Sequence, residues 1–248
     1  MPDPEPHFFS REYELGTAHY RRWFESAPAD AGVIGEKSAD YLSDGAVPAK
    51  LGSLLPDAKL IIQLRDPVER AYSDYKMLFR RGEVGPSPEE YLTSIDNDQP
   101  RFLHDGLYGQ HIARWLDHFG KEQILCFRIE DVTARPRQIL ERMSQHIGVT
   151  PVFKQELARR SENDSKARLL PLPMRKLLKP LKETVKPLRG QPVFEGVRSL
   201  FERDVKYPPL SAALRRQLED FYAADIELTE SLLDIDLASW RCRNAVAA

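Results

Sequence analysis

Three short segments of the chain carry side chains that could perform acid–base or anion-binding chemistry. Glu5 and His7 stand beside Phe8-Phe9, and either ionisable side chain could act as a general base. The apolar pair favours a docked segment over a frayed terminus. Glu36-Lys37-Ser38 follows a short apolar run and places a lysine where a strand is expected to end. Arg65-Asp66-Pro67 joins a second apolar run to a helical pattern.

The Arg65-Asp66-Pro67 junction has the composition of a helix start that could bind phosphate. Asp66 suits the N-cap and Pro67 the first helical position, and the free N–H groups and positive dipole end of a helix start attract anions. Arg65 could hold a phosphate with two hydrogen bonds, and Ser73 on the following helix could add a hydroxyl donor. The alternative is that Asp66 only caps, Arg65 pairs with a carboxylate and Ser73 is a small packing residue.

Lys37 and Arg65 both follow predicted strands. In an open parallel sheet, ligands bind beyond the carboxyl ends of the strands. We therefore expect the two cations to face one crevice, although Lys37 alone would also fit a solvated side chain at a strand end.

The elements that must position these residues alternate between helix and strand. The expected helices span 16–25, 46–55, 67–81, 107–119, 136–147 and 208–233, and the expected strands span 33–38, 58–64 and 124–129. The run 58–64 is continuously apolar, as in a strand buried on both faces, and the polar stretch 83–105 is expected to be a long loop. Alternating strands and helices with short connections predict an α/β fold, a parallel sheet flanked by helices.

The length and composition of the chain indicate its domain organisation and its cellular location. We expect a single domain over 1–248, with a core at about 1–150, a basic, proline-rich region at about 160–207 and a C-terminal helix. The basic stretch 166–189 fits a solvated loop or an electropositive face for an anionic ligand or membrane surface. No run approaches the roughly 20 apolar residues of a transmembrane segment, and no signal peptide is present. Cys126 lies in an apolar run and is expected to be buried. The low cysteine count, with no signal peptide and no transmembrane segment, predicts a cytoplasmic protein.

Several other activities lack their motifs in this chain. Neither G-x-x-x-x-G-K-[ST] nor G-x-G-x-x-G occurs, which removes the main signals of nucleotide hydrolysis and dinucleotide binding. The histidines show no H-E-x-x-H spacing, and two cysteines are too few for a multi-cysteine zinc site or a disulfide scaffold, so no metal is predicted. With 36 basic and 38 acidic residues, the net charge of −2 argues against nucleic acid as a partner.

Taken together, six segments resemble the PAPS-dependent sulfotransferases, specifically the heparan-sulfate and related carbohydrate branch (PAPS is 3′-phosphoadenosine 5′-phosphosulfate). In chain order they are EPHFF (5–9), GTAHYRRWFESAP (16–28), GEKSADYL (35–42), LPDAKLIIQLRDPVERAYSDY (55–75), DGLYGQHIARWLDHFGKEQILCFRIEDV (105–132) and KYPPL (206–210). The resemblance covers most of the chain and is weakest over 160–205. It implies the sulfotransferase variant of the P-loop-like fold.

The resemblance also implies roles for individual residues. Glu5 would be the catalytic base that deprotonates an acceptor hydroxyl or amine, and Lys37 would act at the reacting centre. PAPS would be the co-substrate, and no metal would be required. The implied reaction transfers a sulfuryl group to a glycan or another carbohydrate-like acceptor by in-line attack, for which a carboxylate base and cationic side chains are the tools needed.

The cofactor-binding residues implied by the resemblance lie in two parts of the chain. Arg65 and Ser73 would hold the 3′-phosphate of PAPS. Arg203, Lys206 and Tyr207 fall near the family's K-G-R-x-[YH]-P loop, which covers the cofactor, and Asp204-Val205 occupies the middle of that loop here.

One family element has no counterpart in this sequence. The K-x-G-T-[TS] loop, which cradles the 5′-phosphosulfate, is missing together with the strand and helix around it. Without that strand, an exposed sheet edge would favour a partner or an oligomer. The alternative function is therefore a non-catalytic relative, degenerate or truncated, that binds 3′-phosphoadenosine or glycan. A P-loop kinase is disfavoured because both Walker A and a matching Mg²⁺ aspartate are lacking.

Overall fold

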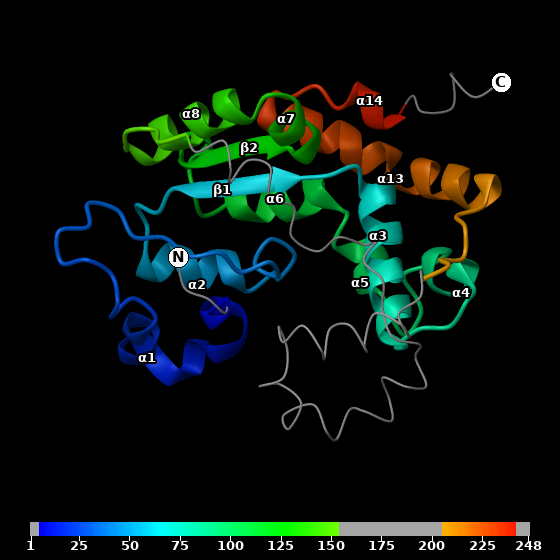
Figure 1. Cartoon of the computed structure of the whole chain (residues 1–248), viewed down its shortest axis with the longest axis horizontal. Helices are drawn as coiled ribbons and strands as arrows, with labels where there is room; N and C mark the ends of the chain where they lie inside the picture. The colour runs from blue at the N-terminus through cyan, green and yellow to red at the C-terminus, as the bar shows by residue number, and fades with distance from the viewer. Residues whose placement is uncertain (1–4, 154–204, 242–248) are drawn as a thin grey trace, which may run out of the picture.

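The computed structural model describes residues 5–153 and 205–241, and Figure 1 shows their arrangement. The basic stretch 166–189 and the predicted cofactor residue Arg203 lie outside the described residues. The described residues comprise most of the predicted core and the C-terminal helix.

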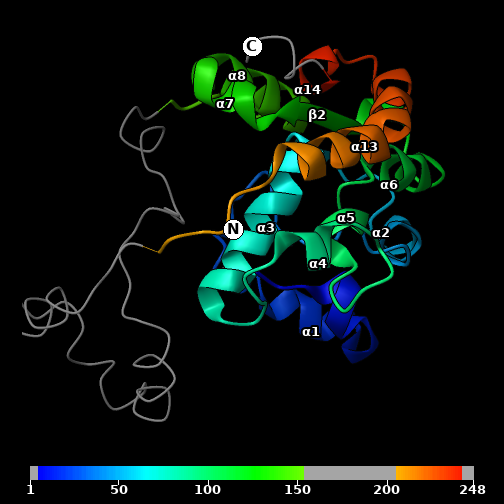
Figure 2. The ribbon, with the colours of Figure 1, turned by 90° about the vertical axis from the view of Figure 1, so that its right-hand side faces the viewer.

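Two strands form a parallel sheet, as expected from the apolar runs. β1 (Leu60–Leu64) pairs with β2 (Ile124–Arg128) in a register that sets Leu60 opposite Ile124 and Leu64 opposite Arg128. Both strands therefore end at the same edge of the sheet. Figures 1 and 2 show α8 on one side of this sheet and α6 on the other, which confirms the predicted α/β arrangement.

The described helices largely follow the predicted pattern. The longer helices are α2 (Val47–Leu54), α3 (Pro67–Arg81), α6 (Tyr108–Leu116), α8 (Pro136–Ile147) and α13 (Ala212–Leu233). The shorter ones are α1 (Gly16–Arg22), α4 (Pro88–Leu92), α5 (Arg101–His104), α7 (Ile129–Ala134), α14 (Ala238–Arg241), the π-helix η1 (Phe8–Glu12) and the 3₁₀ turns η2 (Tyr13–Leu15) and η3 (Lys121–Gln123). Gly82 and Gly148 end α3 and α8 in the left-handed conformation, where glycine avoids a steric cost.

Three predictions about the elements were wrong. The stretch 33–38 forms no strand, and its apolar side chains Val33 and Ile34 are 49% and 55% exposed. An apolar run becomes a strand only when a neighbouring strand pairs with it. The stretch 83–105 is not one long loop, because α4 and α5 lie within it. β1 is not buried on both faces, because Ile61 and Gln63 are exposed.

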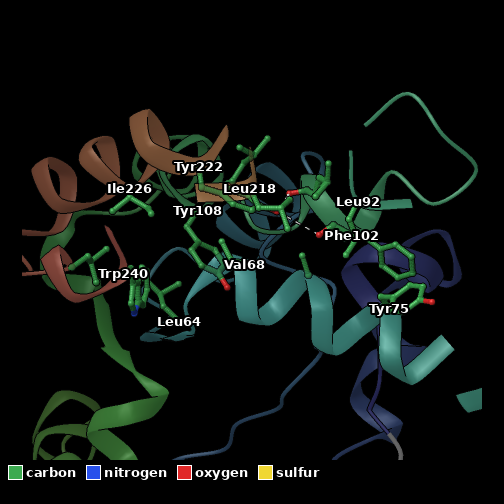
Figure 3. Close-up of a cluster of buried hydrophobic side chains, with 14 of the residues drawn as sticks. Leu64, Val68, Tyr75, Leu92, Phe102, Tyr108, Leu218, Tyr222, Ile226 and Trp240 are labelled. Atoms are coloured by element: carbon green, nitrogen blue, oxygen red, sulfur yellow. Dashed lines mark hydrogen bonds between the residues drawn. The ribbon is translucent and has the colours of Figure 1, made fainter. Parts of the chain in front are cut away.

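The larger core joins the sheet to three helices. Figure 3 shows Leu64 of β1, Val68 and Tyr75 of α3, Tyr108 of α6 and Tyr222 of α13 packed together. Each fully buried aliphatic side chain contributes about 1.5–3 kcal/mol to folding. This packing fixes the start of α3 against the end of β1, where the predicted phosphate-binding residues stand.

A second core holds the N-terminal segment against the domain. Phe8 and Phe9 are fully buried and pack with Tyr41 and Trp115, and Phe8 stacks on Tyr20 with ring centroids 4.5 Å apart. The prediction that the apolar pair docks this segment is therefore confirmed. Glu5 and His7 are carried on a segment with a defined position.

The contact between α6 and α13 includes a buried carboxylate. Asp225 of α13 accepts hydrogen bonds from the backbone N–H groups of Gly109 (2.8 Å) and Gln110 (3.0 Å) in the first turn of α6. It supplies an acceptor to donors that have no partner within their own helix. Burial raises the pKa of Asp225, and the two N–H groups oppose that rise.

Candidate functional site

Glu5 lies at the centre of a group of polar side chains beside the second core. Its Oε1 atom is 2.6 Å from Nζ of Lys37, and its Oε2 atom accepts a hydrogen bond from the backbone N–H of Ala39 at 2.8 Å. Burial alone would raise the pKa of Glu5, but the hydrogen bonds from Lys37 and Ala39 outweigh it and lower the net value. The two residues predicted to act in catalysis are therefore brought together, with Glu5 held as a carboxylate.

The His7 ring lies between Glu5 and a second carboxylate, that of Asp40. Nδ1 of His7 is 2.6 Å from Oδ1 of Asp40, and Nε2 is 3.6 Å from Oε2 of Glu5. The backbone N–H of His7 donates to Oγ of Ser38 at 3.0 Å. His7 also has a φ of 52°, a left-handed conformation that costs a non-glycine residue about 1–3 kcal/mol. The chain thus orients this ring through both its backbone and its side chain.

Asp40 is itself held by donors from the N-terminal segment. Its Oδ2 atom accepts hydrogen bonds from Oγ of Ser10 (3.1 Å) and Nε of Arg11 (3.0 Å). Burial raises the pKa of Asp40, but the hydrogen bonds from His7 and Ser10 outweigh it, so the net pKa is lowered. Asp40 is therefore an anion at neutral pH.

Glu36 fixes the loop that carries Lys37 and Asp40. It accepts hydrogen bonds from the hydroxyls of Tyr20 (2.9 Å), Ser38 (3.0 Å) and Tyr41 (3.1 Å). Burial and the nearby Glu36 charge raise the pKa of Tyr41 to about 12, so this phenol remains a donor. Glu36 thereby fixes the chain that presents Lys37.

At the end of β1, Asp66 caps α3 as predicted. Its carboxylate accepts hydrogen bonds from the N–H groups of Val68 (2.9 Å) and Glu69 (3.2 Å), and the N–H of Arg70 bonds the Asp66 carbonyl at 2.8 Å. Pro67 has no N–H group. The expectation that free N–H groups at this helix start could receive phosphate is therefore wrong, because the N-cap and the helix itself already use them.

Arg65 lines an open depression of about 570 Å³ at the carboxyl ends of both strands. Glu69 of α3 and Ile129, Glu130, Thr133 and Ala134 of α7 form its other walls. Tyr108 of α6 is buried in the larger core together with Leu64, the residue before Arg65, and this packing places α6 beside the end of β1. The location matches the general rule for ligand sites in parallel sheets.

Ser73 lies half-buried on α3, two turns after the start of the helix. The segment 205–210 runs alongside this helix, as Figure 2 shows. The hydroxyl of Tyr72 donates to the carbonyl of Pro208 at 2.7 Å, and the rings of Tyr207 and Phe79 lie 6.3 Å apart. Lys206 is exposed. The structure thus places the predicted residue Tyr207 next to the helix that carries Ser73.

Of the predicted site residues, Glu5 and Lys37 contact each other. Arg65 lines the depression at the end of β1, and Ser73 lies farther along α3, the helix that contacts the segment 205–210 through Tyr72. Within residues 5–153 and 205–241, no hydrogen bond or ion pair joins Glu5 or Lys37 to Arg65, and Lys37 does not line the depression beside Arg65. The expectation that Lys37 and Arg65 face one crevice stays a prediction.

Asp40 and Tyr108 were missed by the sequence reasoning. Asp40 stands in the GEKSADYL segment, so its place two residues after Ser38 was the available signal. Tyr108 stands in the GLYGQH segment, where its aromatic character predicts only core packing. The described residues contain no group of three His, Cys, Asp or Glu side chains that could hold a metal ion. No helix among them is both long and apolar enough to cross a membrane.

Comparison with known proteins identifies the family. A family model described as "Sulfotransferase family" matches residues 4–154, more than half of the chain. The chain belongs to the sulfotransferase family. This sulfotransferase chain is similar to human heparan sulfate glucosamine 3-O-sulfotransferase 3B1, with 31% identity over 154 residues, 60% of this chain and 39% of that protein.

A second kind of relative has a longer chain. The bifunctional heparan sulfate N-deacetylase/N-sulfotransferase 1 of Xenopus tropicalis is 34% identical over 128 residues, which cover 46% of this sulfotransferase chain and 14% of that protein. The matches span well under half the length of both relatives. A crystal structure of a sulfotransferase from Alicyclobacillus acidocaldarius superposes with a TM-score of 0.65 and 23% identity, covering 97% of this chain and 87% of that one. This likeness confirms the predicted α/β sulfotransferase fold.

Proposed function

We propose that this chain transfers a sulfuryl group from PAPS to a hydroxyl or amine of a carbohydrate acceptor. The observation that carries the proposal is the Glu5 carboxylate, which contacts Lys37 at 2.6 Å in a chain that belongs to the sulfotransferase family. The similarity to heparan sulfate sulfotransferases supports a glycan as the acceptor class.

In the proposed reaction, the acceptor oxygen or nitrogen attacks the sulfur atom of PAPS. The new bond forms as the bond between sulfur and the phosphate oxygen breaks, and adenosine 3′,5′-bisphosphate leaves. Glu5 takes the proton released by the acceptor, and the Lys37 ammonium beside Glu5 would balance negative charge near the reacting atoms. Such loose, in-line transfers depend mainly on positioning and on electrostatic stabilisation.

In this proposal, residues at the end of β1, on α3 and in the segment 205–210 bind the sulfuryl donor PAPS. Arg65 and Ser73 would hold the 3′-phosphate, and Lys206 and Tyr207 would cover the nucleotide from the neighbouring segment. The position of Arg65 at the open depression and the packing of Tyr207 beside α3 support this assignment. PAPS would supply the activated sulfuryl group, and a cytoplasmic location remains a prediction from the sequence.

The test is transfer of radioactive sulfur from PAPS to desulfated heparan oligosaccharides, with the protein in excess over the donor. Excess protein makes even a single slow turnover detectable. We expect labelled oligosaccharide that requires both PAPS and protein. A folded chain that neither transfers the label nor binds adenosine 3′,5′-bisphosphate would refute the proposal.

A second candidate is a non-catalytic relative that binds the nucleotide or glycan. The same experiment separates the two functions. Tight binding of adenosine 3′,5′-bisphosphate without any transfer of label would support the binding protein.

A further inference from the structure

Lys76 lies on the same face of α3 as the predicted phosphate-binding residue Ser73. Positions 69, 72, 73 and 76 recur at the three- and four-residue spacing that brings side chains together on a helix surface. The opposite stripe, which includes Val68, Ala71 and Tyr75, is buried in the larger core. This half-exposed face of α3 therefore continues from the depression beside Arg65 to Lys76.

Two tyrosine rings from different parts of the chain hold the Lys76 ammonium. Its Nζ atom is 4.6 Å from the ring centroid of Tyr72 on α3 and 5.9 Å from that of Tyr207 in the segment before α13. The Tyr72 hydroxyl also bonds Pro208, so both rings belong to the contact between α3 and that segment. A cation over an aromatic face is attracted to the ring while its outer side remains open to a ligand.

The Lys76 ammonium is partly desolvated and has charged neighbours of both signs. Burial lowers the pKa of Lys76 most, the charge of Glu69 opposes this, and the positive charge of Arg65 adds a smaller lowering. Among the described residues, Lys76 forms no ion pair with a carboxylate, and Glu69 is 2.8 Å from Arg215 of α13. A partly desolvated ammonium without such an ion pair gains from binding an anion.

The backbone at the start of α3 offers no free donors to an anion. Its first N–H groups already bond Asp66, so an anion at this end of the helix must be held by side chains. Arg65, Ser73 and Lys76 carry donors at or near this face. The Tyr72 hydroxyl on the same face already donates to a backbone carbonyl. A doubly charged phosphate monoester matches them better than a singly charged group does.

We propose that Lys76 is a third ligand of the 3′-phosphate of adenosine 3′,5′-bisphosphate and of PAPS, beside Arg65 and Ser73. This inference rests on the proposed function. Tyr72 and Tyr207 hold the ammonium in place, so the segment 205–210 takes part in nucleotide binding through Lys76. The competing explanation is that Lys76 only packs that segment onto α3.

Calorimetric titration of the full chain separates these explanations. Adenosine 3′,5′-bisphosphate and adenosine 5′-monophosphate are titrated into the wild type, K76M, K76R and the exposed-lysine control K59M. We expect K76M to weaken binding of the bisphosphate about tenfold or more and to leave the monophosphate unchanged, because the charge-assisted hydrogen bond that is lost reaches only the 3′-phosphate. K76R should retain most of the affinity, and K59M should match the wild type.

Each contrary outcome refutes a different statement. If the wild type does not discriminate between the two nucleotides, the assignment of a 3′-phosphate site fails together with the proposed function. If the wild type discriminates and K76M binds both nucleotides as the wild type does, only the role of Lys76 is refuted. If K76M unfolds at a lower temperature and loses affinity for both nucleotides equally, Lys76 is a packing residue and the inference is also overturned.

Discussion

Nδ1 of His7 lies 2.6 Å from a carboxylate oxygen of Asp40, while Nε2 on the other side of the same ring faces Glu5 at 3.6 Å. An ionised carboxylate only accepts hydrogen bonds, so Nδ1 of His7 donates its proton to Asp40. This bond fixes the orientation of the ring whose other nitrogen faces Glu5. Asp40 acts on this arrangement only through His7, which makes it a positioning residue.

Replacing Asp40 by asparagine should release the His7 ring. We expect Asp40→Asn to lower the transfer rate by up to about 10²-fold, the cost of misplacing a group near the reacting atoms. The nitrogen chemical shifts of the His7 ring, assigned by their loss in a His7→Gln variant, should show a mixture of proton positions. Asp30→Asn, at an exposed aspartate, is the matched control. An Asp40→Asn protein with wild-type ring shifts and rate would contradict the role of Asp40.

Acid should destabilise the fold through the carboxylates that are paired in the native state. Asp131 accepts hydrogen bonds from Arg128 (2.9 Å) and Arg135 (2.6 Å), and these hold its pKa at about 2. The unfolded carboxyl has a pKa of about 3.9, so between these values the unfolded chain binds more protons. The stability from this group is therefore present above pH about 4 and is lost as pH falls towards 2.

Thermal unfolding between pH 2 and pH 6 measures this loss. We expect Asp131→Asn to unfold at a lower temperature than the wild type at pH 6 and to lose less stability on acidification. The Asp30→Asn control should follow the wild type throughout. Parallel curves for Asp131→Asn and the wild type would show that the ion pairs of Asp131 do not contribute to acid sensitivity.

Gly109 should resist replacement although it lies in a helix. A Cβ atom there would be 2.8 Å from the carbonyl oxygen of Asp225 and 2.9 Å from the Leu228 side chain. Alanine normally favours a helix over glycine by about 1 kcal/mol, but the close approach of α13 should make Gly109→Ala destabilising by about 1–3 kcal/mol.

Gly52 provides the control for this comparison. It also lies in a helix, α2, but a Cβ atom there would be no closer than 3.4 Å to its neighbours. Urea unfolding of the two alanine variants should therefore give changes of opposite sign, or no change at Gly52. A Gly109→Ala protein as stable as Gly52→Ala would contradict the packing of α6 against α13.

Local sequence signals predicted the structure correctly where the interacting residues are close together in the sequence. Asp66 caps α3, and Gly82 ends it, because both act within one turn of their own helix. Val33 and Ile34 gave the wrong prediction, since an apolar run becomes a strand only through a distant neighbour. The existence of α4 was hidden for a similar reason, because its helix is short and is stabilised by contacts with α3 and α13.

In the candidate site, too, features that depend on residues distant in the sequence could not be predicted. The family resemblance singled out Glu5, Lys37, Arg65 and Ser73, and the structure adds that Glu5 contacts Lys37. The place of Asp40 near Ser38 was a weak signal, because its partner His7 is 33 residues away in the sequence. The occupied N–H groups at the start of α3 were equally hidden, because Asp66 fits both a simple cap and a phosphate-binding start.

The most direct test of the account is the initial rate of sulfuryl transfer from PAPS by Glu5→Gln, measured beside the wild type and the exposed-residue control Glu14→Gln. Glutamine has nearly the same shape as glutamate but cannot take the proton of the acceptor. We predict that Glu5→Gln transfers about 10²–10⁴-fold more slowly than the wild type while its affinity for adenosine 3′,5′-bisphosphate is unchanged. Transfer by Glu5→Gln at the wild-type rate would contradict the assignment of Glu5 as the base.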